Sequence, residues 1–138
     1  MSVMSAPRKA SSPLDAWFLA LREVERLPLA LRRPGWDGHN ASPISGAAHG
    51  EVVDFLGRLF KDFGGASAPA PMVAPDPDGG IALEWSRDDD QGHRELEIVF
   101  LARGNEYSIG YRGCAQAEEE GEDQPVWKLL NLVRQFVS

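Results

Sequence analysis

The chain has 138 residues and a mass of 15.1 kDa, a length that favours one domain over two. Its 14 Lys and Arg against 21 Asp and Glu give a net charge of −7, which argues against general binding to nucleic acid or to an anionic membrane, because phosphates attract positive charge. The single cysteine, Cys114, excludes an intrachain disulfide and a zinc site made of several cysteines.

The charge is unevenly distributed along the chain. Residues 1–35 hold three acids and six bases, whereas residues 36–138 hold 18 acids and eight bases. Such an acidic body is consistent with a solvated surface that maintains solubility. It is also consistent with a patch complementary to a basic partner, which would raise the association rate more than the affinity.

The ends of the chain and its apolar runs suggest a cytoplasmic protein with no membrane partner. Residues 1–12 are short, polar and lack the apolar core of a signal peptide, so we expect a disordered tail. No stretch approaches the ~20 apolar residues that a membrane helix needs. Residues 13–138 are then expected to form a single α+β domain.

Two helices are predicted in the N-terminal half. The first begins at Ser12-Pro13, with Ser12 as its N-cap, and Pro28 should kink or end it. The second is capped by Ser42 or Ser45 and stops at Gly64-Gly65. Residues at helical spacing give each an apolar face: Leu14, Trp17, Phe18, Leu21 and Val24 in the first, and Val52, Val53, Phe55, Leu56, Leu59, Phe60 and Phe63 in the second.

An antiparallel sheet is predicted to follow a Pro- and Gly-rich linker over residues 64–80. Within that linker, residues 72–74 could form a short edge strand. Residues 81–85, 96–100 and 107–111 alternate apolar and polar side chains, which is typical of a meander with one buried face. The aromatic residues of these runs, Trp85, Tyr107 and Tyr111, are expected in the core. Glu84 and Glu97 should then point to the other face, which is either wet or covered by a partner.

The last predicted element is a helix preceded by acidic residues. Residues 118–123 are interpreted as a solvated loop, and Asp123 as the cap of a helix with Pro125 in its first turn. Its expected apolar stripe is Val126, Trp127, Leu129, Leu130, Val133 and Val137. The predicted fold is α+β, with two N-terminal helices, a three- to four-stranded antiparallel meander, and a C-terminal helix packed on one sheet face.

Residues 35–45 stand out because a tryptophan lies among turn-forming residues. We expect Trp36 to plug the core from outside, with its indole N–H bonded to a backbone carbonyl. Asp37 and His39 share this loop, and with His49 or Glu84 they could form a metal or acid/base cluster. The three histidines, however, match no zinc-binding spacing, and we expect no metal and no cofactor.

Other candidate sites have a simpler structural interpretation. Asp88-Asp89-Asp90 and the neighbouring His93 lack the alternation and the final Glu of a calcium loop, so they are interpreted as a solvated hairpin tip. Cys114 has no nearby base, and no Gly-rich phosphate loop is present. Glu84 and Glu97 could form an acid/base pair, although an exposed polar face is the interpretation we favour.

The segments Trp36-Asp37-Gly38, Ala41-x-Pro43-Ile44, Pro77-Asp78-Gly79-Gly80-Ile81-x-Leu83-Glu84-Trp85 and Leu96-Glu97-Ile98 together resemble a pattern found in small uncharacterised bacterial proteins. The resemblance spans about residues 34–112. It implies a bacterial, intracellular accessory protein from mobile or host–phage conflict gene sets. It supplies no catalytic residue to transfer.

We therefore hypothesise a non-catalytic module of the antitoxin, immunity or anti-defence kind, which binds or inhibits another protein through an acidic surface. Two alternatives stay open. One is a small metal-dependent or acid/base hydrolase that uses the Asp37/His39 loop. The other is a structural subunit that self-associates, for example as a homodimer, through a sheet edge or the polar sheet face. The predicted contact residues for a basic protein partner are Trp36, Asp37, His39, Asp88, Asp89, Asp90, Glu118, Glu119 and Glu120.

Overall fold

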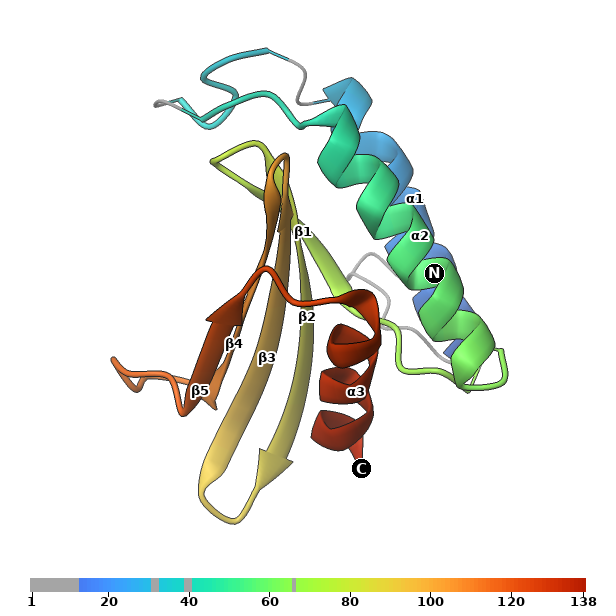
Figure 1. Cartoon of the computed structure of the whole chain (residues 1–138), viewed down its shortest axis with the longest axis vertical. Helices are drawn as coiled ribbons and strands as arrows, with labels where there is room; N and C mark the ends of the chain where they lie inside the picture. The colour runs from blue at the N-terminus through green and yellow to red at the C-terminus, as the bar shows by residue number, and fades with distance from the viewer. Residues whose placement is uncertain (1–12, 31–32, 39–40, 66) are drawn as a thin grey trace, which may run out of the picture.

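The computed structural model places three helices on one side of an antiparallel sheet (Figure 1), and it describes residues 13–30, 33–38, 41–65 and 67–138. Within these ranges the five strands follow one another as a meander in the order β1-β2-β3-β4-β5. The elements are α1 (Pro13–Ala30), α2 (Gly46–Asp62), β1 (Met72–Asp76), β2 (Gly80–Asp89), β3 (Gly92–Leu101), β4 (Gly104–Tyr111), β5 (Glu119–Glu122) and α3 (Val126–Val137).

The α+β class, the antiparallel meander and the C-terminal helix on one sheet face are as predicted, but the strand count of three to four is wrong. The fifth strand, β5, lies within the segment interpreted as a solvated acidic loop and pairs with β4. Sequence pattern missed it because no apolar residue alternates there. The ring of Tyr107 packs against Gly121, where an added Cβ would lie 2.7 Å from the ring, so a side chain at this position would push β5 away.

One buried cluster joins the helices to the sheet. In the register of the strands, Leu83 lies opposite Ile98, and Ile98 lies opposite Tyr107. These side chains share a face with the other buried strand residues and contact the buried faces of all three helices. Trp85 and Tyr107 are buried as predicted, whereas Tyr111 is only partly covered.

Two buried tryptophans fix the path between α2 and β1. The indole N–H of Trp17 donates to the carbonyl of Ala68 at 2.8 Å, and that of Trp85 donates to the carbonyl of Pro69 at 2.9 Å. Both polar ends of these large apolar side chains are therefore satisfied inside the protein. The predicted linker is thereby held against the core, and its residues 72–76 form the edge strand β1.

The N-terminal helices differ from prediction in two respects. First, α1 continues through Pro28 to Ala30, because a proline in the last turn removes only one helical hydrogen bond. Second, the predicted stripe of α1 is divided: Trp17 and Val24 are buried, whereas the remaining three members are exposed. In α2, Ser45 is the N-cap, and its hydroxyl accepts from the amides of Ala47 and Ala48, as one of the two predicted caps should.

Helix α3 begins later than expected. Pro125, not Asp123, is its N-cap, and Asp123 instead adopts a positive φ of 55° in the turn before the helix. Trp127 is exposed, because the buried stripe of α3 is displaced around the helix from the predicted one. That buried stripe consists of Leu129, Leu132, Val133 and Phe136.

Some predictions lie outside the described residues. These are the Ser12 cap, the disordered tail over residues 1–12, and the position of His39. In the described part of the chain, no helix combines the length and apolar character that crossing a membrane requires.

The tight approach of β2 to β3 generates a stability prediction. A Cβ at Gly80 would collide with the backbone carbonyl oxygen of Phe100, so we expect Gly80→Ala to lower the free energy of unfolding by about 2–3 kcal/mol. Gly57 lies in the exposed interior of α2 with no atom near the added Cβ, so Gly57→Ala should raise it by about 0.5–1 kcal/mol. Urea unfolding of both variants tests this, and a Gly80→Ala protein as stable as the parent would contradict it.

Candidate functional site

The sheet face opposite the helices, here called the open face, carries a nearly uniform negative charge. Because side chains alternate between the two faces of a strand, the register places every second residue of each strand there. In the described strands the charged members of this face are all acidic, and His93 is its only histidine. The acids are Asp76, Glu84, Asp88, Glu95, Glu97, Glu106, Glu120 and Glu122.

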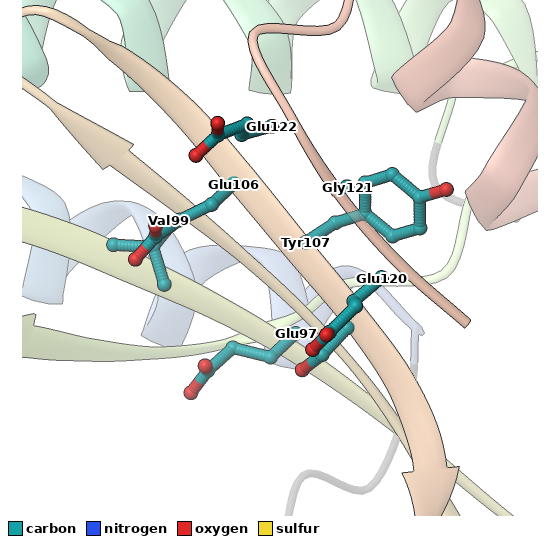
Figure 2. Close-up of a pocket in the computed structure, with 8 residues that line it drawn as sticks. Glu97, Val99, Glu106, Tyr107, Glu120, Gly121 and Glu122 are labelled. Carbon is teal, nitrogen blue, oxygen red and sulfur yellow. The ribbon is translucent and has the colours of Figure 1, made fainter. Parts of the chain in front are cut away.

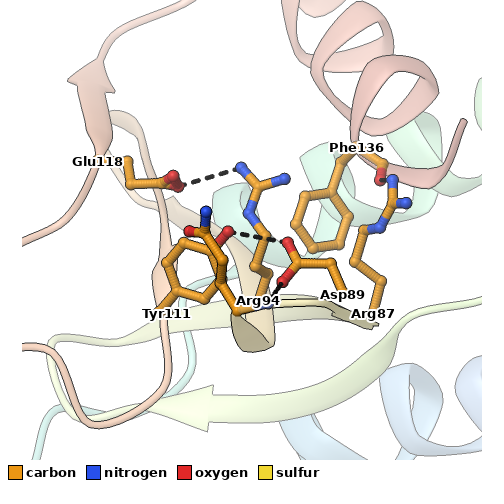
Figure 3. A network of polar contacts seen from close by, with 7 residues as sticks. Arg87, Asp89, Arg94, Tyr111, Glu118 and Phe136 are labelled. Atoms are coloured by element: carbon orange, nitrogen blue, oxygen red, sulfur yellow. Dashed lines mark hydrogen bonds and ion pairs between the residues drawn. The ribbon is translucent and has the colours of Figure 1, made fainter.

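The two arginines of the strands lie on the opposite face, where both are engaged (Figure 3). Arg87 donates to the carbonyl oxygens of Phe136 and Ser138 at the end of α3, at 2.7 and 2.8 Å. Arg94 lies over the rings of Tyr111 and Phe136 and donates to Glu118 at 3.1 Å. The strand cations thus hold α3 and do not neutralise the open face.

All of these acids except Asp76 and Asp88 line two adjoining hollows of about 550 and 360 Å³, here called the acidic groove. The hollows share Glu97, Ser108 and Glu120. Figure 2 shows the carboxylates of Glu97 and Glu120 on one side of the strands, together with those of Glu106 and Glu122. The segment 114–117 forms one wall, since its backbone passes within 3.4 Å of the Cβ position at Gly110. The groove therefore has the dimensions of a binding site, with carboxylates as its polar groups.

The centre of the open face is apolar and largely dry. Val99 and Ala82 lie opposite one another on neighbouring strands, and each is only 5% exposed although none of the described helices covers this face. Glu97 lies next to them and is half-buried, directly opposite Glu84. Like charges in such a cross-strand pair repel, and a low-dielectric surround strengthens that repulsion.

Protonation of Glu97 relieves this repulsion. Burial is the largest cause that raises the pKa of Glu97 to about 7, followed by its hydrogen bond to Glu84 and the charge of Glu84. The charges of Asp76 and Glu106 act in the same direction. Near neutral pH the pair therefore carries less than its full negative charge. The sequence placed both residues on this face, as the structure has them, and raised their pairing as an alternative.

The acidic residues of the predicted hairpin tip do not all lie on one face of the sheet. Asp88 contacts Nδ1 of His93 at 2.8 Å on the open face. Asp89 instead accepts from the hydroxyl of Tyr111 at 2.8 Å on the helix side. Asp90 is exposed at the turn. Two of the three predicted contact residues therefore already have partners within the hairpin region.

The acids of the predicted acidic loop also lie on different faces of the sheet, because residues 119–122 form strand β5. Glu118 binds Arg94, and Glu119 accepts a hydrogen bond of 2.7 Å from Tyr107, which raises the pKa of that hydroxyl. Glu120 alone of the three predicted residues, Glu118, Glu119 and Glu120, lines the acidic groove.

The Trp36 loop lies at the other end of the sheet. The indole of Trp36 donates to the carbonyl of Ser42 at 2.6 Å, as predicted for the N–H, but its ring is only partly covered and lies outside the buried core. Asp37 accepts from the amide of Ala41 within the same loop. The loop is bonded to the β1–β2 turn through Ser42 and the carbonyl of Pro77.

The residues predicted for a hydrolase are therefore not brought together where they are described. Glu84 is five residues along β2 from that turn, or ~17 Å at the rise of an extended strand. Nε2 of His49 is buried in α2 without a hydrogen bond. Among the described residues, no three His, Cys, Asp or Glu side chains are grouped so that they could hold a metal ion.

Searches with the sequence found no matching family model and no matching curated protein, and a search with the structure found no matching solved structure.

Sequence reasoning missed part of the groove. Glu106 and Glu122 line it but were not named as contact residues. A signal was present, because continuing the period-two alternation of residues 107–111 back to 106 places Glu106 on the face of Glu84 and Glu97. No such signal existed for Glu122, since the strand that carries it was not predicted.

The raised pKa of Glu97 predicts a pH-dependent stability. The folded-state pKa of Glu97 is raised, so its contribution to stability falls as pH rises from about 4.5, where the unfolded carboxyl ionises, through about 7. Glu97→Gln stays neutral and can still donate to Glu84. We expect it to be more stable than the parent by about 1 kcal/mol at pH 8 and to lose this advantage near pH 4.5.

Urea unfolding at several pH values measures the difference. The matched control is Glu122→Gln, an exposed residue on the same face, which should change stability by less than about 0.5 kcal/mol at any of these pH values. Equal stability of Glu97→Gln and the parent at both pH 4.5 and pH 8 would refute the raised pKa of Glu97.

Proposed function

We propose that this protein is a non-catalytic module that binds a basic partner protein through the acidic groove on the open face of its sheet. The observation that carries the proposal is the separation of charge between the two sheet faces. In the described strands, both arginines lie on the helix side, and the eight acids of the open face have no lysine or arginine among them.

The shape of the face supports a macromolecular partner. The groove lies across β2, β3, β4 and β5, and its two hollows extend from Glu84 to Glu122. Lysine or arginine side chains of a partner could reach several carboxylates at once, because the acids that line the groove lie on four neighbouring strands.

The electrostatics also define how the partner would bind. A field of one sign increases the rate of encounter with an oppositely charged surface, and the increase falls as salt screens it. An inhibitory or immunity-type role is consistent with such rapid capture of a basic protein. We place the module in bacteria and in the cytoplasm on the sequence arguments given above.

A decalysine peptide serves as the probe for this groove. Cys114 is the only cysteine of the chain, is exposed and lies at the wall of the groove, so a fluorophore attached there reports binding nearby. We expect binding that weakens steeply between about 50 and 300 mM salt. The double variant Glu106→Gln/Glu120→Gln should weaken it about tenfold, because two groove carboxylates are lost.

A control of equal net charge separates the groove from the general acidity of the chain. Glu51→Gln/Asp54→Asn removes two exposed charges from α2 and should change the affinity less than about twofold. Equal weakening by both double variants would mean that net charge alone attracts the peptide, and it would contradict the proposed site.

A further inference from the structure

Helix α1 has more apolar surface than the core uses. Leu14, Phe18 and Leu21 follow the i, i+4, i+7 spacing of a continuous helical stripe, and they are 48%, 58% and 43% exposed. The buried stripe with Trp17 and Val24 lies beside it on the same helix. A second apolar stripe next to the first is typical of a helix that packs against two neighbours.

Helix α2 also carries exposed apolar residues. Val53 and Phe60 are one heptad apart on α2, and both are exposed. The ring of Phe60 contacts that of Trp17 edge to face, with centroids 5.2 Å apart, so the two helices meet there. We call Leu14, Phe18, Leu21, Val53 and Phe60 the α1 patch. Exposed apolar side chains gathered on two packed helices are typical of an interaction surface.

The charged residues beside the patch could pair with the same residues of a second copy. Asp15 and Arg22 are both exposed and lie on one flank of Phe18, rotated about 40–60° around the helix, whereas Leu14 and Leu21 lie on the other flank. Consider two α1 helices that pack antiparallel, with a twofold axis passing beside Phe18. Each residue of one copy then lies level with the residue of the other copy that is the same number of positions from Phe18 in the opposite direction. Asp15 of each copy then comes level, to within ~1.5 Å, with Arg22 of the other.

The same symmetry joins the apolar residues. Leu14 of each copy comes level with Leu21 of the other, on the flank opposite the charges. The same twofold axis therefore places Leu14 beside Leu21 and Asp15 beside Arg22 in both halves of the contact, as an isologous interface requires.

We infer that α1 is a homodimer interface, in which two copies of this chain pack their α1 patches antiparallel about Phe18. The other surfaces suit a second copy less well. The open face would meet its own negative charge, and the edge strand β5 presents Glu119, Glu120 and Glu122. The inference concerns α1 and does not depend on the acidic groove.

Sedimentation velocity from about 5 to about 500 μM tests the dimer. Because the patch is small, we expect a dissociation constant on the order of 10–100 μM, seen as a rise of the mean mass from 15.1 kDa toward twice that value. Phe18→Ser should weaken dimerisation at least about tenfold. Leu19→Ser is the matched control, since Leu19 is 52% exposed and is rotated about 100° around α1 from Phe18, beyond Asp15 and Arg22, and it should dimerise like the parent.

Charge reversal tests the antiparallel geometry. Asp15→Arg should weaken the dimer by placing two arginines together, and the double variant Asp15→Arg/Arg22→Asp should restore it, with circular dichroism showing that each variant is folded. A parent chain that stays monomeric at about 500 μM, or equal effects of Phe18→Ser and Leu19→Ser, would overturn the interface. Failure of the double variant to restore dimerisation would overturn the antiparallel arrangement about Phe18.

Discussion

Strands β2, β3 and β4 alternate apolar and polar side chains, and the rest of the structure depends on this alternation. A shift of one residue in the pairing of β2 with β3 would turn one of the two strands over, which would expose either Leu83 or Ile98 and bury Glu84 or Glu97 in its place. The helices cover the apolar face, and both buried tryptophans bind the connection from α2 to β1 on that side. The charged face is therefore left open by the same constraint that builds the core.

The centre of the open face lowers the stability of the folded protein. Glu84 and Glu97 are directly opposite one another beside the dry Val99, and protonation of Glu97, whose pKa is raised to about 7, relieves their repulsion. A leucine or threonine pair would fit the same positions without this cost. Functional sites are often places where the local arrangement lowers stability although the rest of the chain favours the fold. For this reason the groove, and not the hairpin tip, is the centre of the proposed function.

The sequence predicted those parts of the fold that an apolar period specifies. The shared buried face of Leu83, Ile98 and Tyr107 follows from such a period, and so does the buried face of α2, although its predicted stripe also included Val53 and Phe60, which are exposed. Strand β5 could not be predicted in this way, because it is specified by the fit of Tyr107 over Gly121 and by backbone pairing. Likewise, the helical period gives α1 a wide apolar arc but does not say which part of the arc the core covers.

The acidic groove and the α1 patch belong to opposite sides of the molecule, and this has a consequence for binding. Charge segregation leaves the helical layer with bases and acids in nearly balanced number, whereas the open face carries only acids. A dimer through α1 would therefore leave both acidic grooves free. Two linked grooves can engage two basic sites of one partner or of a partner assembly, and the second contact then forms at a high effective concentration. Weak individual contacts between exposed charges, each small because water and salt screen them, would in this way add up to stable capture.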